Sequence, residues 1–155
     1  MRRKDREVTE LTEILAIIDR CKVCRLGFQD ANGVYIVPMN FGYTYKCGTL
    51  TFYFHSAMQG RKIRLLEQGG VIGFELDCGH QLIEGYQACD YGYRFESVIG
   101  TGYATVLTKE MEKMHALEQL MRHQTGRAFS FTPDMTHTVT VFSLTVETIS
   151  CKRHS

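Results

Sequence analysis

Apolar and polar residues alternate along several short stretches of the chain. The alternation is clearest over Thr49–His55, where Leu50, Phe52 and Phe54 fall on one face. A period of two is typical of a strand with one buried face. The pattern therefore predicts a strand here, and it places His55 on the outer face, away from the apolar core.

Similar stretches, separated by turn residues, predict five more strands. They are Val23–Phe28, Val34–Tyr43, Val71–Asp77, Arg94–Leu107 and Val139–Ile149. The pair Asn32-Gly33 is a strong signal for a tight turn, and Tyr45–Gly48 is expected to form another. We expect Cys78–Tyr93 to be a long, partly extended polar connection and Ala128–Thr138 to be a loop.

Apolar residues at helical spacing predict three helices. They cover Thr9–Arg20, Ser56–Gln68 and Thr108–Gln124. Thr9 and Ser56 are the expected N-caps of the first two, Ser56 through a capping box with Gln59. The side chains expected to face inward on the third helix are Met111, Met114, Leu117 and Met121.

Strands thus follow one another through short turns, with no regular alternation of strand and helix. This order favours a mainly β fold, a mostly antiparallel sheet with flanking helices, over a parallel nucleotide-binding fold. Gly100 and Gly102 suit a sharply coiled strand in a small barrel. The 155 residues contain no linker or repeat, so residues 1–155 are expected to form a single domain.

The charge balance and hydropathy limit the partners. Eighteen Lys and Arg side chains stand against 17 Asp and Glu, a formal net charge of +1, so no nucleic-acid partner is expected. No apolar run approaches the roughly 20 residues of a membrane helix. The basic start, Met1–Arg6, is not followed by the apolar stretch of a signal peptide, and the expected location is the cytoplasm, away from the membrane.

Six cysteines without a secretory signal favour free thiols over a disulfide scaffold. Cys21 and Cys24 form a CxxC pair, but it closes a helix rather than opening one, which argues against thioredoxin-like chemistry. No second CxxC follows, so we expect no metal site.

The segment Phe54–Lys62 carries the most chemistry, because a strand ends and a helix begins there. Helix N-termini favour anions, and Ser56, Arg61 and Lys62 add a hydroxyl and two cations, a combination that suits a phosphate group. A capped surface helix with two solvated cations is the alternative, and the segment alone does not separate the two interpretations.

The run Val37-Pro38-Met39-Asn40 is unusual for a strand, because proline cannot donate to a strand ladder. Either this strand lies at a sheet edge, with backbone groups free for a flat polar ligand, or it bulges at a barrel rim.

These motifs together resemble the flavin-binding split-barrel superfamily of pyridoxamine-phosphate-oxidase-like proteins, and within it the nitroimidazole-resistance (Nim) branch. The matching segments are Met1–Lys4, Cys21–Gly27, Tyr35–Tyr43, Tyr53–Ala57, Gly60–Lys62, Cys89 and Glu96–Gly102. The resemblance implies an FMN-binding split β-barrel that works as a homodimer, with cofactor sites between the subunits.

The same resemblance assigns roles by position. Ser56, Arg61 and Lys62 would hold the FMN phosphate, while Val37, Pro38, Met39 and Asn40 would line the flavin ring through backbone groups. His55 would lie beside the flavin as the catalytic residue, and Ser97 would approach from the region around the partner subunit. Tyr35, Tyr43 and Tyr53 are expected on the exposed face that the partner covers.

The function expected from the resemblance is reduction of small nitro-aromatic or related compounds. A flavin- or haem-binding module without turnover, in which an outward His can bind haem iron, is also compatible with the sequence. So are a structural dimer with a vestigial pocket and a relative of pyridoxamine-phosphate oxidase with another substrate. Pyridoxamine-phosphate oxidation itself is not expected, because the chain has no Trp where true oxidases carry Trp-containing substrate elements.

Overall fold

Two long antiparallel strands, β7 (Gly92–Val106) and β8 (Thr140–His154), form the spine of the structure. The computed structural model of the chain describes residues 3–155, so the first two residues of the basic N-terminal segment lie outside it. Six further strands complete one eight-stranded sheet of antiparallel pairs. They are β1 (Glu7–Val8), β2 (Val23–Asp30), β3 (Gly33–Asn40), β4 (Gly42–Lys46), β5 (Thr49–Ser56) and β6 (Val71–Ile83).

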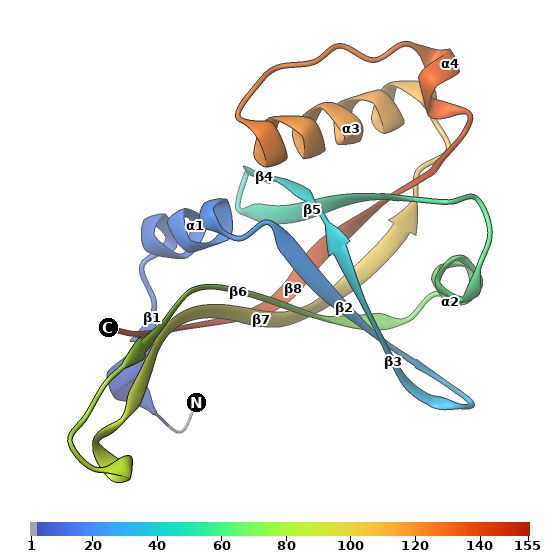
Figure 1. Cartoon of the computed structure of the whole chain (residues 1–155). Helices are drawn as coiled ribbons and strands as arrows, with labels where there is room; N and C mark the ends of the chain where they lie inside the picture. Colours follow the sequence, from blue (N-terminus) through green and yellow to red (C-terminus); the bar gives the residue numbers. More distant parts are fainter. Residues whose placement is uncertain (1–2) are drawn as a thin grey trace.

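The sheet runs in the order β3-β2-β6-β7-β8-β5-β4, with β1 beside β8. The edge strands β3 and β4 are joined by a single residue, Phe41, so the chain passes directly from one edge of the sheet to the other. Figure 1 shows how strongly the sheet curls. The predicted mainly antiparallel fold with flanking helices is confirmed.

The close approach of neighbouring strands explains why position 100 is a glycine. A Cβ on Gly100 would collide with the Thr148 carbonyl oxygen and the Phe74 ring. The register of β7 against β8 also shifts between Thr101 and Gly102. The glycine pair therefore lies where the two long strands bend together, as a sharply coiled strand requires.

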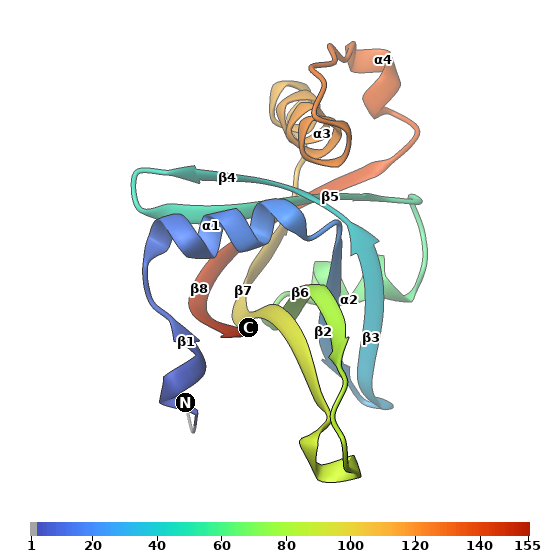
Figure 2. The ribbon, with the colours of Figure 1, turned by 60° about the vertical axis from the view of Figure 1, so that its left-hand side comes forward.

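Residues 3–155 form four α-helices. They are α1 (Leu11–Arg20), α2 (Arg61–Gln68), α3 (Glu110–Thr125) and α4 (Pro133–Thr136), with short 3-10 turns η1 (Lys4–Arg6) and η2 (Ala88–Asp90). Of these helices, α4 packs on α3 rather than on the sheet. In Figure 1, α3 and α4 lie above β4 and β5, and α2 lies at the opposite side from α1. Figure 2 shows α1 lying across one end of the curled sheet.

Two predicted caps are wrong. Ser56 does not open α2, because it is the last residue of β5 and pairs with Thr140 of β8; the N-cap of α2 is Gly60. Thr9 does not cap α1 either, since the N-cap position falls on Glu10 and makes no side-chain bond.

The expected inner face of α3 is also shifted. The buried residues are Ala116, Leu117, Leu120 and His123. Met111 is 74% exposed, and Met114 and Met121 are half-buried. The spacing of the methionines therefore predicted the helix correctly, but it did not predict which side of the helix is buried.

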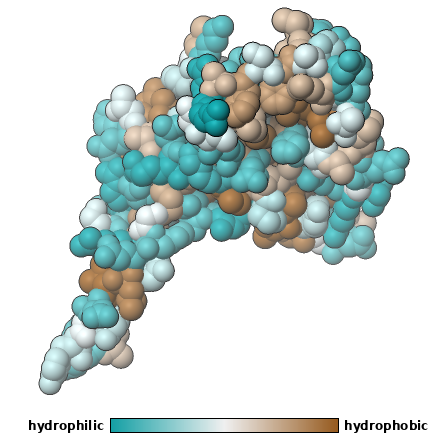
Figure 3. Space-filling view, turned by 45° about the horizontal axis from the view of Figure 1, so that its top comes forward, coloured by the Kyte–Doolittle hydropathy of each residue, from teal (hydrophilic) through white to brown (hydrophobic). Residues whose placement is uncertain are grey.

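The connection expected at Cys78–Tyr93 is partly extended, as predicted: β6 runs to Ile83 and β7 begins at Gly92. β6 and β7 continue through it as a hairpin arm (residues 78–95) whose tip contains η2. Figure 3 shows this arm standing clear of the body, with apolar surface along it. Its exposed apolar residues include Leu82, Tyr86, Tyr91 and Tyr93. The last strand runs to His154 rather than ending at Ile149, because β1 and the arm extend its ladder.

All six cysteines are free thiols. Within residues 3–155, no three His, Cys, Asp or Glu side chains gather in a way that would hold a metal ion. None of the helices in this range is both long enough and apolar enough to span a membrane.

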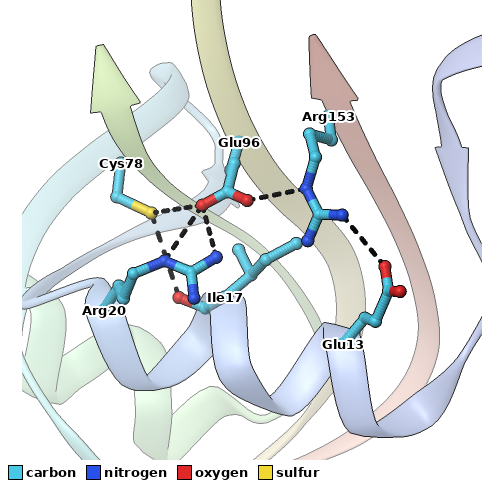
Figure 4. Close-up of polar contacts among 6 residues, drawn as sticks. All are labelled: Glu13, Ile17, Arg20, Cys78, Glu96 and Arg153. Atoms are coloured by element: carbon cyan, nitrogen blue, oxygen red, sulfur yellow. Dashed lines mark hydrogen bonds and ion pairs between the residues drawn. The ribbon is translucent and has the colours of Figure 1, made fainter. Parts of the chain in front are cut away.

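An ion-pair network ties α1 to the sheet (Figure 4). The carboxylate of Glu96, whose side chain is 16% exposed, accepts hydrogen bonds from Arg20 Nε at 3.0 Å and Arg153 Nε at 2.8 Å. Arg153 also donates to Glu13 Oε2 at 3.0 Å, and the Cys78 thiol donates to Glu96 Oε2 at 3.6 Å. Burial alone would raise the pKa of Glu96, but the two arginines outweigh it and lower the pKa.

We predict that Glu96→Gln lowers the free energy of unfolding by about 1–2 kcal/mol at pH 7, because charge-assisted bonds are lost from a half-exposed network. A folded-state pKa below the ordinary value stabilises the fold above that value, and this stabilisation disappears as the pH falls through the folded pKa. The difference from wild type should therefore shrink in acid. Urea unfolding measures both effects.

The matched control is Glu112→Gln, whose exposed pair with Lys109 should change stability by less than about 0.5 kcal/mol. Equal losses in the two variants would contradict a specific role for Glu96.

Candidate functional site

The junction between β5 and α2 is an open helix start. After Ser56 the chain crosses Ala57–Gly60, and Gly60 adopts φ +139°, a conformation that favours glycine. A Cβ at Gly60 would meet no atom within 4 Å. The first helical hydrogen bond runs from Arg64 N to Gly60 O at 3.2 Å, so the preceding amides have no partner within the helix. The junction offers backbone donors to an open space.

Arg61 does not extend freely into that space. Its Nε and Nη2 bind Asp30 Oδ2 at 2.9 and 2.8 Å, and its guanidinium stacks over Tyr35 at 4.5 Å from the ring centroid. The backbone amide of Asn32 and, after it, Arg61 lower the pKa of Asp30. Asp30 thus balances the charge of Arg61 and ties α2 to the β2–β3 turn.

Lys62 is the cation left unbalanced at this junction. It is half-buried, and it has no hydrogen-bond or carboxylate partner among residues 3–155. Burial lowers its pKa, since the charged form loses hydration without a counter-ion. An anion here would supply the missing partner.

His55 lies on the outer face, as predicted. Leu50, Phe52 and Phe54 are buried, whereas His55 is exposed and pairs with Val141 of β8. Partial desolvation and the charge of Lys62 lower the pKa of His55, so the ring is neutral at pH 7. A neutral imidazole beside a free ammonium can both donate and accept hydrogen bonds.

The segment Val37–Asn40 forms part of an edge strand, because β3 pairs only with β2 within the described chain. The β2–β3 ladder is unbroken, with Pro38 opposite Arg25. The edge interpretation is therefore confirmed and the bulge is not observed. Met39 is buried, and the Asn40 side chain donates to Lys22 O at 3.1 Å. Because β3 is an edge strand, the backbone groups on its outer side are open to a ligand.

Ser97 is held far from His55 within one chain. His55 pairs with Val141 and Ser97 with Lys152, positions eleven residues apart on β8. Eleven residues of fully extended strand span at most about 36 Å, and the curl of the sheet shortens this span, but the two residues still lie near opposite ends of β8. The fold of one chain brings together His55, Ser56, Arg61 and Lys62, but not Ser97.

Sequence reasoning missed Asp30 and Tyr35 as partners of Arg61. Asp30 sits in the turn that the Asn-Gly signal marked, and its contact with α2 depends on the order of strands in the sheet. Hydrophobic periodicity does not determine that order, so no local signal identified the pair.

The sequence matches the family model described as pyridoxamine 5'-phosphate oxidase over residues 10–153. The chain belongs to the pyridoxamine 5'-phosphate oxidase family. No curated protein matches it significantly in sequence. The split-barrel fold expected from the resemblance is confirmed by solved structures of family relatives.

One solved relative is a Bacteroides thetaiotaomicron protein assigned to 5-nitroimidazole antibiotic resistance. It is 33% identical with a TM-score of 0.80, and the match covers 95% of this chain and 86% of that one. The flavocytochrome Anf3 of Azotobacter vinelandii is 20% identical with a TM-score of 0.79, over 100% and 72% of the two chains. An FAD- and haem-binding protein of Mycobacterium smegmatis is 14% identical with a TM-score of 0.81, over 97% and 74%. At these identities the last two show the fold alone.

Proposed function

We propose that this family member binds FMN with its phosphate at the β5–α2 junction. The observation that carries the proposal is the half-buried Lys62 ammonium without a counter-ion, beside the open start of α2 at Gly60. A phosphate there gains a point charge from Lys62 and backbone N–H donors from the helix. Ser56 and Arg61 complete the set of donors.

Arg61 holds the junction in shape before the phosphate arrives. Two of its N–H groups bind Asp30, and a guanidinium has five, so it retains donors for a second oxygen anion. The backbone of Val37–Asn40 on the free edge of β3 would line the flavin ring. When bound, FMN would supply the electron transfer, and the protein would bind and orient it.

We further propose that the substrates are small nitro-aromatic compounds, with His55 beside the flavin. Support comes from the 33% identity to the protein assigned to 5-nitroimidazole resistance. His55 is exposed and neutral at pH 7, so it can hydrogen-bond a ligand and take up or release a proton. A flavin- or haem-binding module without turnover is the second candidate, favoured by the fold shared with the haem-binding relatives.

The chain has an apolar face suited to a second copy of itself. On the outer sheet face, Val34 and Ile36 of β3, Val71 of β6, and Ile99 and Tyr103 of β7 are 48–70% exposed. Their ladder partners place them on neighbouring strands around Gly27 and Gly73, where the missing side chains leave a hollow of about 340 Å³. Exposed apolar patches of this kind mark interfaces.

A homodimer through this outer sheet face would also explain the remote position of Ser97, which would then reach the cofactor of the partner. The tyrosines expected to form the interface do not lie on an open face. Tyr35 stacks against Arg61, Tyr43 bonds Asp19, and Tyr53 bonds Thr44, and all three are half-buried.

We predict that Lys62→Gln weakens FMN binding by at least tenfold, since a charge-assisted bond contributes about 1.5–3 kcal/mol. Riboflavin, which lacks the phosphate, should bind wild type weakly and be insensitive to the substitution. Flavin fluorescence titrations measure both affinities, with Arg64→Gln on the exposed side of α2 as the control. Unchanged FMN affinity in Lys62→Gln would refute the phosphate site.

We predict that His55→Ala slows substrate reduction without unfolding the protein. FMN-loaded protein is reduced anaerobically with dithionite and mixed with a 5-nitroimidazole, and flavin absorbance reports reoxidation. The rate per bound flavin should fall at least tenfold, in line with lost proton transfer, while stability changes by less than about 0.5 kcal/mol. His115→Ala is the control. No reoxidation in wild type would favour a binding module, and a Soret band in the purified protein would favour haem.

We predict that Ile36→Asp converts a dimer into a monomer, because it puts a charge in the centre of the outer sheet face. Sedimentation velocity at micromolar concentration should show this change, and Met111→Asp, on the exposed side of α3, should remain dimeric. FMN affinity should fall together with the dimer in Ile36→Asp. A monomeric wild type, or a dimer indifferent to the substitution, would exclude this interface.

A further inference from the structure

A hollow of about 620 Å³ lies where the C-terminal ends of α1 and α3 meet β4. It has the size of a small-molecule pocket. Its lining includes Asp19, Lys22, Tyr43, Tyr45, Arg122 and His123. None of these residues belongs to the β5–α2 junction, so the hollow is distinct from the proposed phosphate site. It adjoins the end of the proposed flavin-lining segment, because the Asn40 side chain donates to Lys22 O at 3.1 Å.

The Lys22 ammonium inside this hollow already has hydrogen-bond partners. The Lys22 ammonium donates to the Asp19 carbonyl at 3.0 Å and to the His123 carbonyl at 2.7 Å. These carbonyls stand in the last turns of α1 and α3, where the helix dipoles are negative. Lys22 therefore neutralises two helix ends and leaves the side chains of Asp19 and His123 for other partners.

His123 has one nitrogen satisfied and one not. Its ring, 3% exposed, packs against Phe41 at a centroid distance of 4.5 Å. Nε2 lies 2.8 Å from the Cys21 carbonyl oxygen, which can only accept, so Nε2 carries the proton. Nδ1 is buried and has no hydrogen-bond partner. Burial lowers the pKa of His123, so the neutral ring presents Nδ1 as a bare acceptor.

Nδ1 faces a second acceptor. Asp19 Oδ1 lies 3.6 Å from Nδ1 and accepts a hydrogen bond from the Tyr43 hydroxyl at 3.2 Å. The Asp19 side chain is 69% exposed and lines the hollow, so a rotation of this side chain would open a path to Nδ1. The two acceptors cannot bond each other, so Nδ1 lacks a donor, and an unpaired buried acceptor is costly.

We infer that this hollow binds a small molecule carrying a protonated amino group, which donates N–H bonds to Asp19 and to His123 Nδ1. An ammonium group supplies several donors and a charge that pairs with Asp19. Tyr43 and Tyr45 offer aromatic faces to a cation. Arg122 is exposed at the rim, where solvent and salt screen its charge.

The test uses the full chain at pH 8 with benzylamine, which is protonated there, and benzyl alcohol as the uncharged match. Calorimetric titration should show saturable binding of benzylamine only. The ¹⁵N signal of His123 Nδ1 should shift with the same saturation curve, because that nitrogen gains a donor. A shift confined to other residues, or no saturation below about 10 mM, would overturn the inference.

Variants separate the site from general charge effects. Asp19→Asn should weaken benzylamine binding at least tenfold, whereas Asp134→Asn on α4, which is outside the hollow, should leave it unchanged. Lys62→Gln should also leave it unchanged, because Lys62 does not line the hollow. Equal affinity in Asp19→Asn and wild type would show that the amine binds elsewhere.

Discussion

The chain crosses from one edge of the sheet to the other at a single residue, Phe41. The free edge of β3 and the hollow at His123 both depend on this crossing. Phe41 is fully buried between β3 and β4, with its ring against Phe52 at 5.4 Å and His123 at 4.5 Å. Its carbonyl accepts a bond from Gln124 at 2.8 Å, which fixes the end of α3. Because the chain turns away from β3 at Phe41, β3 keeps a free edge on one side of this turn. The hollow below α3 opens on the other side.

The two adjacent cations of α2 have different physical roles because of their neighbours. Arg61 is neutralised by Asp30 and packed on Tyr35, so it holds the β2–β3 turn against the helix. Lys62 shares the helix start but is half-buried without a counter-ion. The same two charges were indistinguishable in the sequence. Their surroundings commit Arg61 to Asp30 and Tyr35 and leave Lys62 without a counter-ion, which is why we propose Lys62 as the main phosphate ligand.

Local patterns predicted most of the strands, and tertiary contacts explain the errors. The alternation over β5 was sufficient because one face of that strand is buried throughout. The capping box at Ser56 failed because pairing of Ser56 with Thr140 extends the strand, a long-range contact that no local pattern contains. The hairpin pairing within the arm was not predicted, because its residues are mostly exposed and so carry little alternation. Of the candidate site, the cations and His55 were found, whereas Asp30 and the hollow at His123 depend on the order of strands.

The geometry of β8 decides how much of a flavin site one chain can build. β8 pairs with β5 near one end and with the arm end of β7 near the other. Both residues are paired within strands of one sheet, His55 with Val141 and Ser97 with Lys152, so no loop movement brings Ser97 to His55. Any site that uses both residues must therefore be assembled from two chains. The outer sheet face, with its glycine hollow between exposed apolar strands, is where we propose that a second chain docks.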